Sequence, residues 1–263
     1  MFKYLELPKY ITNEFTAQAK KYCVCVPVIN EGDKIRKQLE RMTVAKISDY
    51  ADIIICDGGS NDDSLNREFL QANHVSALLT KQDTGKLSAQ LRMGYYYALN
   101  NRSYAGIVTI DGNNKDSVEN IIDIIAKLED GYDLIQGSRF IPGGKAINTP
   151  LIRHLAVKFI HIPAISHIAG FKYTDTTNGF RGYSRKFLED PRVEPFRKIF
   201  DSYELLAYLS VRAPQLGYKV TEVPVCRSYP PKGKIPTKIS FVKGNSKLLS
   251  ILNDLYKHRY DPE

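Results

Sequence analysis

Apolar and polar positions along this chain fall into blocks that repeat a strand-then-helix pattern. Runs rich in Val, Ile and Cys, such as 21–29 and 51–56, end abruptly in Asn, Asp and Gly. The first run leads into a stretch in which Ile35, Leu39 and Met42 recur at the spacing of an amphipathic helix. Buried strands that alternate with such helices are typical of a doubly wound, mostly parallel α/β sheet flanked by helices. We expect further strands at 75–80, 105–110, 132–136 and 218–225, and further helices at 118–128, at 203–213 and from about Lys86 to about Asn100.

The regular alternation weakens after the fifth expected strand. A glycine-rich loop is expected at 137–145, and an apolar stretch follows at 151–169, in which Pro163 is expected to break the helix. Three histidines lie in that stretch without a carboxylate, so we interpret them as solvated side chains and not as metal ligands. A turn and a short strand are expected at 175–183, and the apolar spacing at 240–256 predicts an amphipathic helix.

The length and composition suit one large α/β domain with short additions at its ends. At 263 residues and 43% hydrophobic content, the chain can bury one sizeable core. We expect an N-terminal arm at 1–20, the α/β domain at 21–229, and a basic loop with a basic amphipathic helix at 230–263. The net charge of +8 is concentrated at that end, since eight basic residues lie between Cys226 and Tyr260 against Asp254 alone. This distribution predicts a local anionic partner.

The sequence has neither an apolar run of about eighteen residues nor a signal-peptide core near its start. We therefore expect a cytoplasmic protein that does not span a membrane. The four cysteines all lie in apolar runs without metal-ligand spacing, so reduced core positions are expected. They are Cys23, Cys25, Cys56 and Cys226.

Polar residues follow the expected strands at the points where those strands end. Asp111, Gly112 and Asn113 follow the fourth strand, and Asp57 follows the second. The carboxyl ends of parallel strands meet at one edge of the sheet, where ligands bind in open α/β folds. Gly112 would let the backbone approach a ligand, and the side-chain oxygens of Asp111 and Asn113 would suit a hard cation such as Mg²⁺. The simpler alternative for each residue is an ordinary turn or helix cap.

Six short segments stand in a characteristic order and spacing. They are Pro-x-x-Asn-Glu at 27–31, Asp-Gly-Gly-Ser-Asn-Asp at 57–62, Asp-Gly-Asn at 111–113, Gly-Ser-Arg-Phe at 137–140 with Gly143 and Gly144, and the stretches 175–183 and 217–225. Together they resemble the motifs of family 2 glycosyltransferases of the GT-A fold, and within that family the polyprenol-phosphate (dolichol-phosphate) sugar transferases. The resemblance covers about residues 22–250 and implies a Rossmann-like GT-A domain.

For the donor side, the resemblance implies a site for a nucleoside-diphosphate sugar. Asp57 would accept hydrogen bonds from the base, Glu31 would accept from the ribose, and Lys86 would meet the diphosphate. Asp111 and Asn113 would hold Mg²⁺ or Mn²⁺, but Asn113 stands where the family has a second acidic residue, which lowers the charge attraction for the metal. Lys115 would share in neutralising the phosphates, unless it is a solvated loop lysine. The implied donor-binding set is Pro27, Asn30, Glu31, Asp57, Lys86, Asp111 and Gly112.

For the acceptor side, the resemblance implies a phosphate site made of basic residues. An arginine fork matches two phosphate oxygens at once, and two arginines would neutralise a dianion. If the acceptor is a sugar hydroxyl instead, a carboxylate must take its proton, and Asp175, with Glu204 behind it, is the candidate base. The implied acceptor-binding set is Arg139, Arg153, Arg227 and Lys234, and the implied catalytic set is Asp111, Asn113, Arg139 and Asp175.

The sequence thus predicts an inverting hexosyltransferase that moves a sugar from a nucleoside diphosphate to an acceptor phosphate, with polyprenol phosphate as the expected acceptor. The stretch 151–169 and the C-terminal helix would then contact the inner face of the membrane. One alternative is transfer to a sugar hydroxyl in polysaccharide synthesis. A sugar nucleotidyltransferase would need a glycine-rich phosphate loop, which 27–33 lacks. A nucleic-acid-binding module would need a recognition motif beside the basic tail, and the sequence has none, so no nucleic-acid partner is expected.

Overall fold

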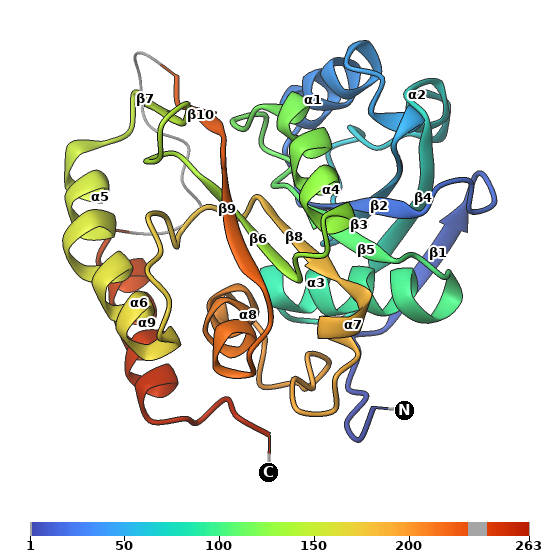
Figure 1. The fold of residues 1–263 in the computed structure, drawn as a ribbon. Coiled ribbons are helices and arrows are strands. Elements are labelled where there is room, and N and C mark those ends of the chain that lie inside the picture. The colour runs from blue at the N-terminus through green and yellow to red at the C-terminus, as the bar shows by residue number, and fades with distance from the viewer. Residues whose placement is uncertain (1, 231–240, 263) are drawn as a thin grey trace.

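A mixed eight-stranded sheet forms the centre of the molecule (Figure 1). The structure is a computed structural model that describes residues 2–230 and 241–262, with side chains at 2–230 and 247–262. In spatial order, the strands are β1 (Tyr10–Glu14), β4 (Val75–Lys81), β3 (Ala51–Asp57), β2 (Tyr22–Val28), β5 (Gly106–Thr109), β8 (Arg181–Ser184), β6 (Leu134–Ser138) and β9 (Val220–Pro224).

The parallel block β4-β3-β2-β5 confirms the strand-helix alternation expected from the sequence. Every residue of β2 and β3 is buried, because branched apolar side chains pack on both faces of these central strands. Val28 pairs with Asp57 and Cys25 pairs with Thr109, so the three strands end close together. The register therefore brings the polar residues after each strand to one edge of the sheet.

Two strands run against the parallel direction. β8 lies between β5 and β6 and is antiparallel to both, whereas the strand-by-strand expectation placed no reversed strand inside the sheet. Gly182 in β8 permits this insertion, since a Cβ there would lie 2.4 Å from Ile124 Cγ2 on the helix above. β1, which lies in the expected N-terminal arm, pairs antiparallel with β4 at the edge. The sheet nevertheless remains mostly parallel.

Helices cover both faces of the sheet and divide the core into two apolar clusters. One face carries α1 (Asp33–Val44), α2 (Arg67–Ala72) and α4 (Ile121–Glu129), with Ile35, Leu39 and Met42 fully buried as predicted. The other face carries α3 (Leu87–Tyr96), which continues into the π-helical turn η2 (Tyr97–Asn101), together with α8 (Glu204–Gln215). Short elements complete the chain: η1 (Ile47–Asp49), η3 (Val118–Asn120), α7 (Arg185–Leu188), β7 (Lys145–Ile147) and β10 (Cys226–Ser228).

A helical column forms the side of the molecule away from β1 (Figure 1). It runs from α5 (Leu151–Ala156) through the π-helical turn η4 (Val157–His161) into α6 (Ile162–Ala169). The expectation that Pro163 breaks this helix was wrong. Pro163 lies in the first turn of α6, directly after the wide π-turn. At this position the missing N–H of proline removes no required hydrogen bond. The C-terminal helix α9 (Phe241–Tyr256) packs against α6 and α8. Its predicted apolar stripe is buried at Ile251, Leu252 and Leu255, but Leu249 is exposed.

The cysteine prediction is confirmed for three positions. Cys23, Cys25 and Cys56 are free and buried, whereas the free thiol of Cys226 is only half-buried. Within the described residues, the helices are all too short or too polar to cross a membrane.

Candidate functional site

The loops after β2 and β3 bind each other and form the first part of the predicted donor site. Asn30 has a positive φ of 46°, its backbone N–H donates to Ser60 Oγ at 2.9 Å, and its Oδ1 accepts from the Asn61 N–H at 2.9 Å. Asp57 is buried, and its Oδ1 accepts from both the N–H (2.9 Å) and the hydroxyl (2.6 Å) of Ser60. These contacts fix the backbone of both loops. They also hold Asp57 at the edge of the sheet with further acceptor capacity on its carboxylate.

Two further side chains complete this part of the edge. Gln90 on α3 donates to the carbonyls of Val28 (2.6 Å) and Cys56 (2.9 Å), which ties the ends of both strands to the helix. Glu31 accepts from Lys34 Nζ at 2.9 Å, and its side chain is 13% exposed. Asp57, Asn30 and Glu31 therefore lie together, as the sequence predicted, beside the buried Pro27.

Asp111 and Asn113 lie next to this region, after β5. The Gly112 N–H donates to the Pro27 carbonyl at 3.2 Å, and a Cβ on Gly112 would lie 2.7 Å from Val28 Cγ2, so only glycine fits there. The Asp111 side chain is 25% exposed, and Asn113 Nδ2 lies 3.4 Å from Asp111 Oδ2. The side-chain oxygen of Asn113 is buried and has no hydrogen-bond partner. No cluster of three or more His, Cys, Asp or Glu side chains suited to a metal occurs among the described residues.

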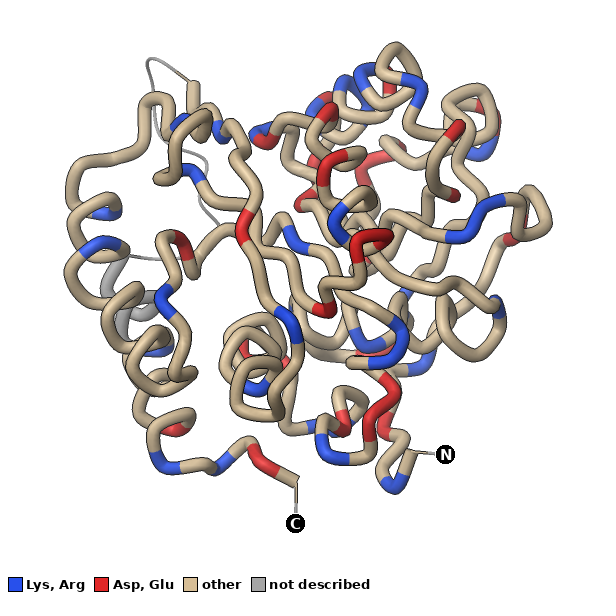
Figure 2. The backbone as a smooth tube through the Cα atoms, in the orientation of Figure 1, with Lys and Arg blue, Asp and Glu red and all other residues tan. Residues whose placement is uncertain are grey.

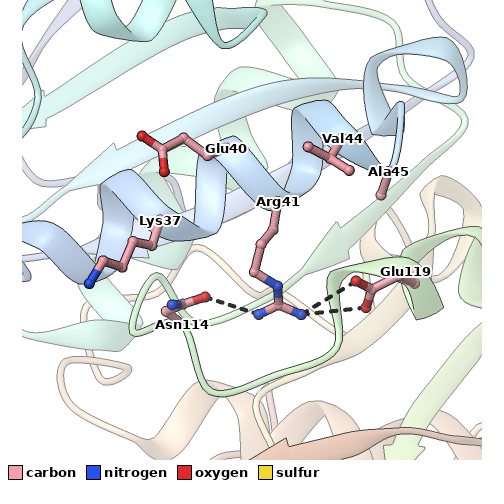
Figure 3. A pocket seen from close by; sticks show the side chains of 7 residues that line it. All are labelled: Lys37, Glu40, Arg41, Val44, Ala45, Asn114 and Glu119. Atoms are coloured by element: carbon pink, nitrogen blue, oxygen red, sulfur yellow. Dashed lines mark hydrogen bonds and ion pairs between the residues drawn. The ribbon is translucent and has the colours of Figure 1, made fainter.

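The loop after Asn113 is held by α1. The Arg41 guanidinium donates to Asn114 Oδ1 at 2.9 Å and pairs with Glu119 at 3.4 Å (Figure 3). Gln38 accepts from the Asn114 N–H at 2.7 Å. Figure 3 shows an open surface hollow beside these contacts. None of the residues that line it belongs to the predicted site. They are Lys37, Glu40, Arg41, Val44, Ala45, Asn114 and Glu119.

Arg227 binds two carboxylates at this edge of the sheet. It is 6% exposed, its Nη2 lies 3.2 Å from Asp111 Oδ2, and its Nη1 pairs with Asp116. Burial lowers the pKa of Arg227, but the carboxylates of Asp116 and Asp111 outweigh this and raise it. Burial raises the pKa of Asp116 to about 6, against the lowering effect of Arg227. Arg227 therefore joins Asp111 directly, a contact that the sequence did not indicate, and its predicted role with an acceptor phosphate stays a prediction.

Arg139 and Asp175 bind each other in the interior. Arg139 Nε donates to Asp175 Oδ2 at 2.6 Å and Nη2 donates to Oδ1 at 2.9 Å, with side chains only 2% and 0% exposed. Glu222 accepts from the Asp175 N–H at 3.2 Å and from Thr174, which fixes the loop behind the pair. Both side chains are almost completely buried, so the roles predicted for them also stay predictions.

A second group of cations surrounds Tyr229. Lys115 Nζ lies 4.9 Å from the ring centroid, and the guanidinium carbons of Arg227 and Arg153 lie at 5.9 and 6.0 Å. The ring is 2% exposed, and its hydroxyl has no hydrogen-bond partner. Burial raises the pKa of Tyr229, but Arg153 and Arg227 outweigh it and lower the pKa. Tyr203 lies near this group, where the charges of Asp111 and Arg153 act on it.

Sequence reasoning missed Tyr203 and Tyr229 as site residues. Neither belongs to a motif, and the only sequence signal for Tyr229 is its place two residues after Arg227 in the basic segment.

Three predicted residues remain. Lys86 is exposed at the start of α3, and its backbone N–H donates to the Asp201 carbonyl at 3.0 Å. Glu204 is buried and pairs with Lys247 at 2.8 Å, which leaves it badly placed to act as a base. Lys234 lies outside the described residues.

These features define a GT-A-like fold: a mostly parallel sheet with helices on both faces and acidic and amide groups along its carboxyl edge. The family model "Glycosyl transferase family 2" matches residues 23–191, more than half of the chain. The chain therefore belongs to glycosyl transferase family 2. The predicted family and fold are both confirmed.

Two curated relatives show what this chain resembles within the family. The undecaprenyl-phosphate 4-deoxy-4-formamido-L-arabinose transferase of Klebsiella pneumoniae is 25% identical over 242 residues, which cover 90% of this chain and 66% of the relative. The chain thus spans slightly less than two thirds of that protein. The polyprenol monophosphomannose synthase of Mycolicibacterium smegmatis is 27% identical over 208 residues, covering 77% of this chain and 75% of the relative.

Solved structures support the fold assignment. Glucosyl-3-phosphoglycerate synthase from Mycobacterium tuberculosis, in complex with uridine diphosphate, superposes with a TM-score of 0.62 at 13% identity. The match covers 91% of this chain and 81% of that one. A second structure of the same enzyme, with Mn²⁺, uridine diphosphate and phosphoglyceric acid, has a TM-score of 0.61 at 15% identity and covers 90% and 76% of the two chains.

Proposed function

We propose that this chain transfers a sugar, with inversion, from a nucleoside diphosphate to the phosphate of a polyprenol. The observation that carries the proposal is the juxtaposition of two unlike groups. Carboxylate and amide side chains line the edge after β2, β3 and β5, and the cations around Tyr229 meet that edge through the contact of Arg227 with Asp111. The names of both curated relatives specify a polyprenol or undecaprenyl phosphate, which supports a lipid phosphate as the acceptor.

On the donor side, the proposal keeps the residues expected from the sequence. Asp57 and Glu31 supply carboxylate acceptors for the N–H groups of a base and the hydroxyls of a ribose. Asn30 and Pro27 shape the backbone beside them, and Lys86 reaches the diphosphate from the start of α3. These roles rest on the edge that the ends of β2, β3 and β5 share with α3.

A divalent cation, Mg²⁺ or Mn²⁺, forms part of the proposal. Asp111 and Asn113 would hold it. The Asn113 amide lies next to the Asp111 carboxylate through its Nδ2, and its Oδ1 is buried without a hydrogen-bond partner, which fits such a ligand set. When bound, the ion would supply positive charge to the diphosphate. The structure of the M. tuberculosis enzyme holds Mn²⁺ together with uridine diphosphate, which agrees with this assignment.

The reaction needs no strong base when the acceptor is a phosphate. The second pKa of a phosphate monoester is about 6, so an acceptor oxygen is already anionic at neutral pH. That oxygen forms a bond to the anomeric carbon while the bond to the diphosphate oxygen breaks and its electron pair leaves with the diphosphate. Arg153 would hold the acceptor phosphate. The closed Arg139–Asp175 pair and the Glu204–Lys247 pair favour this acceptor over a sugar hydroxyl, because both candidate bases are buried and bound to cations.

We further propose that the helical column contacts a membrane surface. Its outer face exposes five large apolar side chains, and residues 141–174 carry four basic residues and no acid (Figure 2). The exposed fractions are 71% for Leu151, 63% for Ile152, 43% for Leu155, 67% for Phe159 and 46% for Ile160. A face of this kind suits an interface of acyl chains and anionic headgroups.

Sedimentation with vesicles of phosphatidylcholine and phosphatidylglycerol tests the membrane contact. Wild type should co-sediment at low salt, and the double variant Leu151→Ser, Phe159→Ser should remain in the supernatant. Val44→Ser removes an apolar side chain that is 84% exposed on α1 and should behave as wild type. Equal sedimentation of all three proteins would count against the proposed face.

The proposed activity is tested with a panel of nucleotide sugars, Mg²⁺ or Mn²⁺, and polyprenol phosphate. The expected result is release of the nucleoside diphosphate only when the lipid phosphate is present. Release that requires an oligosaccharide acceptor would favour polysaccharide synthesis, and release of pyrophosphate would favour a nucleotidyltransferase. Retention of DNA without any turnover would favour a nucleic-acid-binding module.

A further inference from the structure

Lys115 is fixed in place, unlike a solvated loop lysine. Its carbonyl accepts from the Ser228 N–H at 2.8 Å, and the residues on either side are held by Gln38 and Arg227. Its side chain is half-buried, with the ammonium 4.9 Å from the centroid of the Tyr229 ring. The backbone and the ring together therefore aim this cation in one direction.

The charge of Lys115 lacks a close acidic partner. Throughout the part of the chain that the structure describes, no carboxylate lies within 4.0 Å of its ammonium. The carboxylates whose charges act on it are Asp111 and Glu31, which belong to the proposed donor site. A partly desolvated cation without a carboxylate partner is costly, and an anionic ligand would offset that cost.

The proposed metal ligands, Asp111 and Asn113, would hold a divalent ion only weakly. Asn113 contributes a neutral oxygen, and the guanidinium of Arg227 already lies 3.2 Å from Asp111 Oδ2. A divalent ion bound by Asp111 would be repelled by Arg227, and Asn113 would add no negative charge to attract it. Fixed side-chain cations are therefore the more permanent positive charge at this edge.

We propose that Lys115 binds the diphosphate of the donor and stabilises the negative charge that builds on it as the sugar leaves. When the bond between the anomeric carbon and the diphosphate oxygen breaks, the electron pair goes to that diphosphate and the Lys115 ammonium donates a hydrogen bond to it. The acceptor phosphate oxygen forms the new bond to carbon. The inference rests on the proposed function and adds that nucleotide binding, and part of the turnover, persist without a divalent ion.

Calorimetry with UDP and with GDP in excess EDTA tests this directly. Wild type should bind one of the two nucleotides without metal, and Lys115→Ala should weaken that binding about tenfold or more, since it removes a charge-assisted hydrogen bond. Lys115→Arg should retain most of the affinity. Lys37→Ala removes an exposed lysine from the outer side of α1 and should bind as wild type (Figure 3).

A second variant separates the lysine from the metal. Asn113→Asp should raise the affinity for Mn²⁺, measured by calorimetry, and should make the loss caused by Lys115→Ala smaller when Mn²⁺ is present. The inference is overturned if EDTA abolishes nucleotide binding to wild type, or if the Lys115→Ala and Lys37→Ala proteins bind equally well.

A different result would contradict the proposed function without contradicting the role of Lys115. If wild type binds UDP or GDP in EDTA but never transfers a sugar to polyprenol phosphate, the acceptor assignment is wrong while Lys115 remains a nucleotide ligand. If wild type binds neither nucleotide even with Mn²⁺, both the donor site and the inference are overturned.

Discussion

The two halves of the sheet manage polar groups in opposite ways. After β2 and β3, neutral donors such as Ser60 and Asn61 bind Asp57 and Asn30. On the side of β6, β8 and β10, buried arginines bind buried carboxylates, as in Arg139–Asp175 and Arg227–Asp116. Beyond these buried ion pairs, the column from α5 to α6 carries basic residues and no acidic ones (Figure 2).

This difference suggests how one chain can hold two anionic substrates. A nucleotide needs acceptors for its base and ribose, and neutral loop contacts leave the carboxylates able to accept. A lipid phosphate needs cations, and cations held near carboxylates keep their place when no ligand is bound. The donor half is therefore expected to tolerate loss of a contact with its fold intact, while the acceptor half is expected to lose stability.

The largest expected effect is on stability, from Arg227→Met. The variant leaves the buried Asp116 without its cation, so the carboxyl group must either stay charged without a partner or take up a proton. Breaking such a buried pair typically costs about 3–5 kcal/mol in the free energy of unfolding. The melting temperature should fall by roughly 10 °C or more. Arg192→Ala breaks an ion pair whose arginine side chain is 61% exposed, so its melting temperature should match wild type. Equal, small shifts for both variants would remove the contrast between the halves.

The next effect is on turnover, from Asp111→Ala. Removing this carboxylate should lower the rate of nucleoside diphosphate release about 10²–10³-fold, the usual cost of losing one group that stabilises charge in the transition state. The melting temperature should change much less than in Arg227→Met, because Asp111 is partly exposed. Asp123→Ala, which removes an exposed carboxylate on α4, provides the control. Unchanged turnover in Asp111→Ala would exclude Asp111 from the reaction.

The pH dependence of stability gives a third test, through Asp116. Its pKa is about 6 in the folded chain and near the ordinary value of 3.8 when unfolded. Between pH 3.8 and pH 6 the folded chain binds a proton at Asp116 and the unfolded chain does not. The free energy of unfolding of wild type should therefore rise, relative to Asp116→Asn, as the pH falls from 7 to 4. It should fall again as the pH rises through 6. The gain should be about 2–3 kcal/mol, measured by denaturant unfolding. Parallel pH profiles for the two proteins would show that Asp116 has an ordinary pKa.

The smallest expected effect concerns acceptor affinity, from Arg153→Gln. Loss of a charge-assisted hydrogen bond, typically about 1.5–3 kcal/mol, should raise KM for polyprenol phosphate about tenfold or more. KM for the nucleotide sugar should stay the same. Lys37→Gln removes an exposed basic residue on α1 and should change neither constant. A rise in the donor KM instead would move Arg153 to the other half of the site.

The sequence predicted where the residues of the proposed donor half lie, because the signals for their position are local. The apolar runs of β2, β3 and β5 identify buried parallel strands, and parallel strands bring their carboxyl ends together, so Asp57 and Asp111 could be placed without coordinates. The acceptor half depends on contacts between distant residues. Nothing local indicates that Arg227 reaches Asp111, or that Tyr229 gathers Lys115 and Arg153 around its ring.

Two structural features were hidden for related reasons. The sequence predicted a short strand at 175–183, but not that β8 runs antiparallel between β5 and β6. Arg181 in this strand is buried because it donates to the carbonyls of Thr176 and Asn178 and to Ser210. Pro163 appeared to end a helix because the π-turn before it has no sequence signature. In both cases tertiary contacts decided what local preference did not.

The central claim, that each half binds a different substrate, is tested most directly by measuring both ligands on the same variants. UDP or GDP and a short-chain polyprenol phosphate are titrated separately into wild type, Asp57→Ala and Arg153→Gln. The account predicts that Asp57→Ala weakens only the nucleotide and that Arg153→Gln weakens only the lipid phosphate. It would be contradicted if either variant lost both ligands, with its melting temperature unchanged, or if each lost the ligand assigned to the other half.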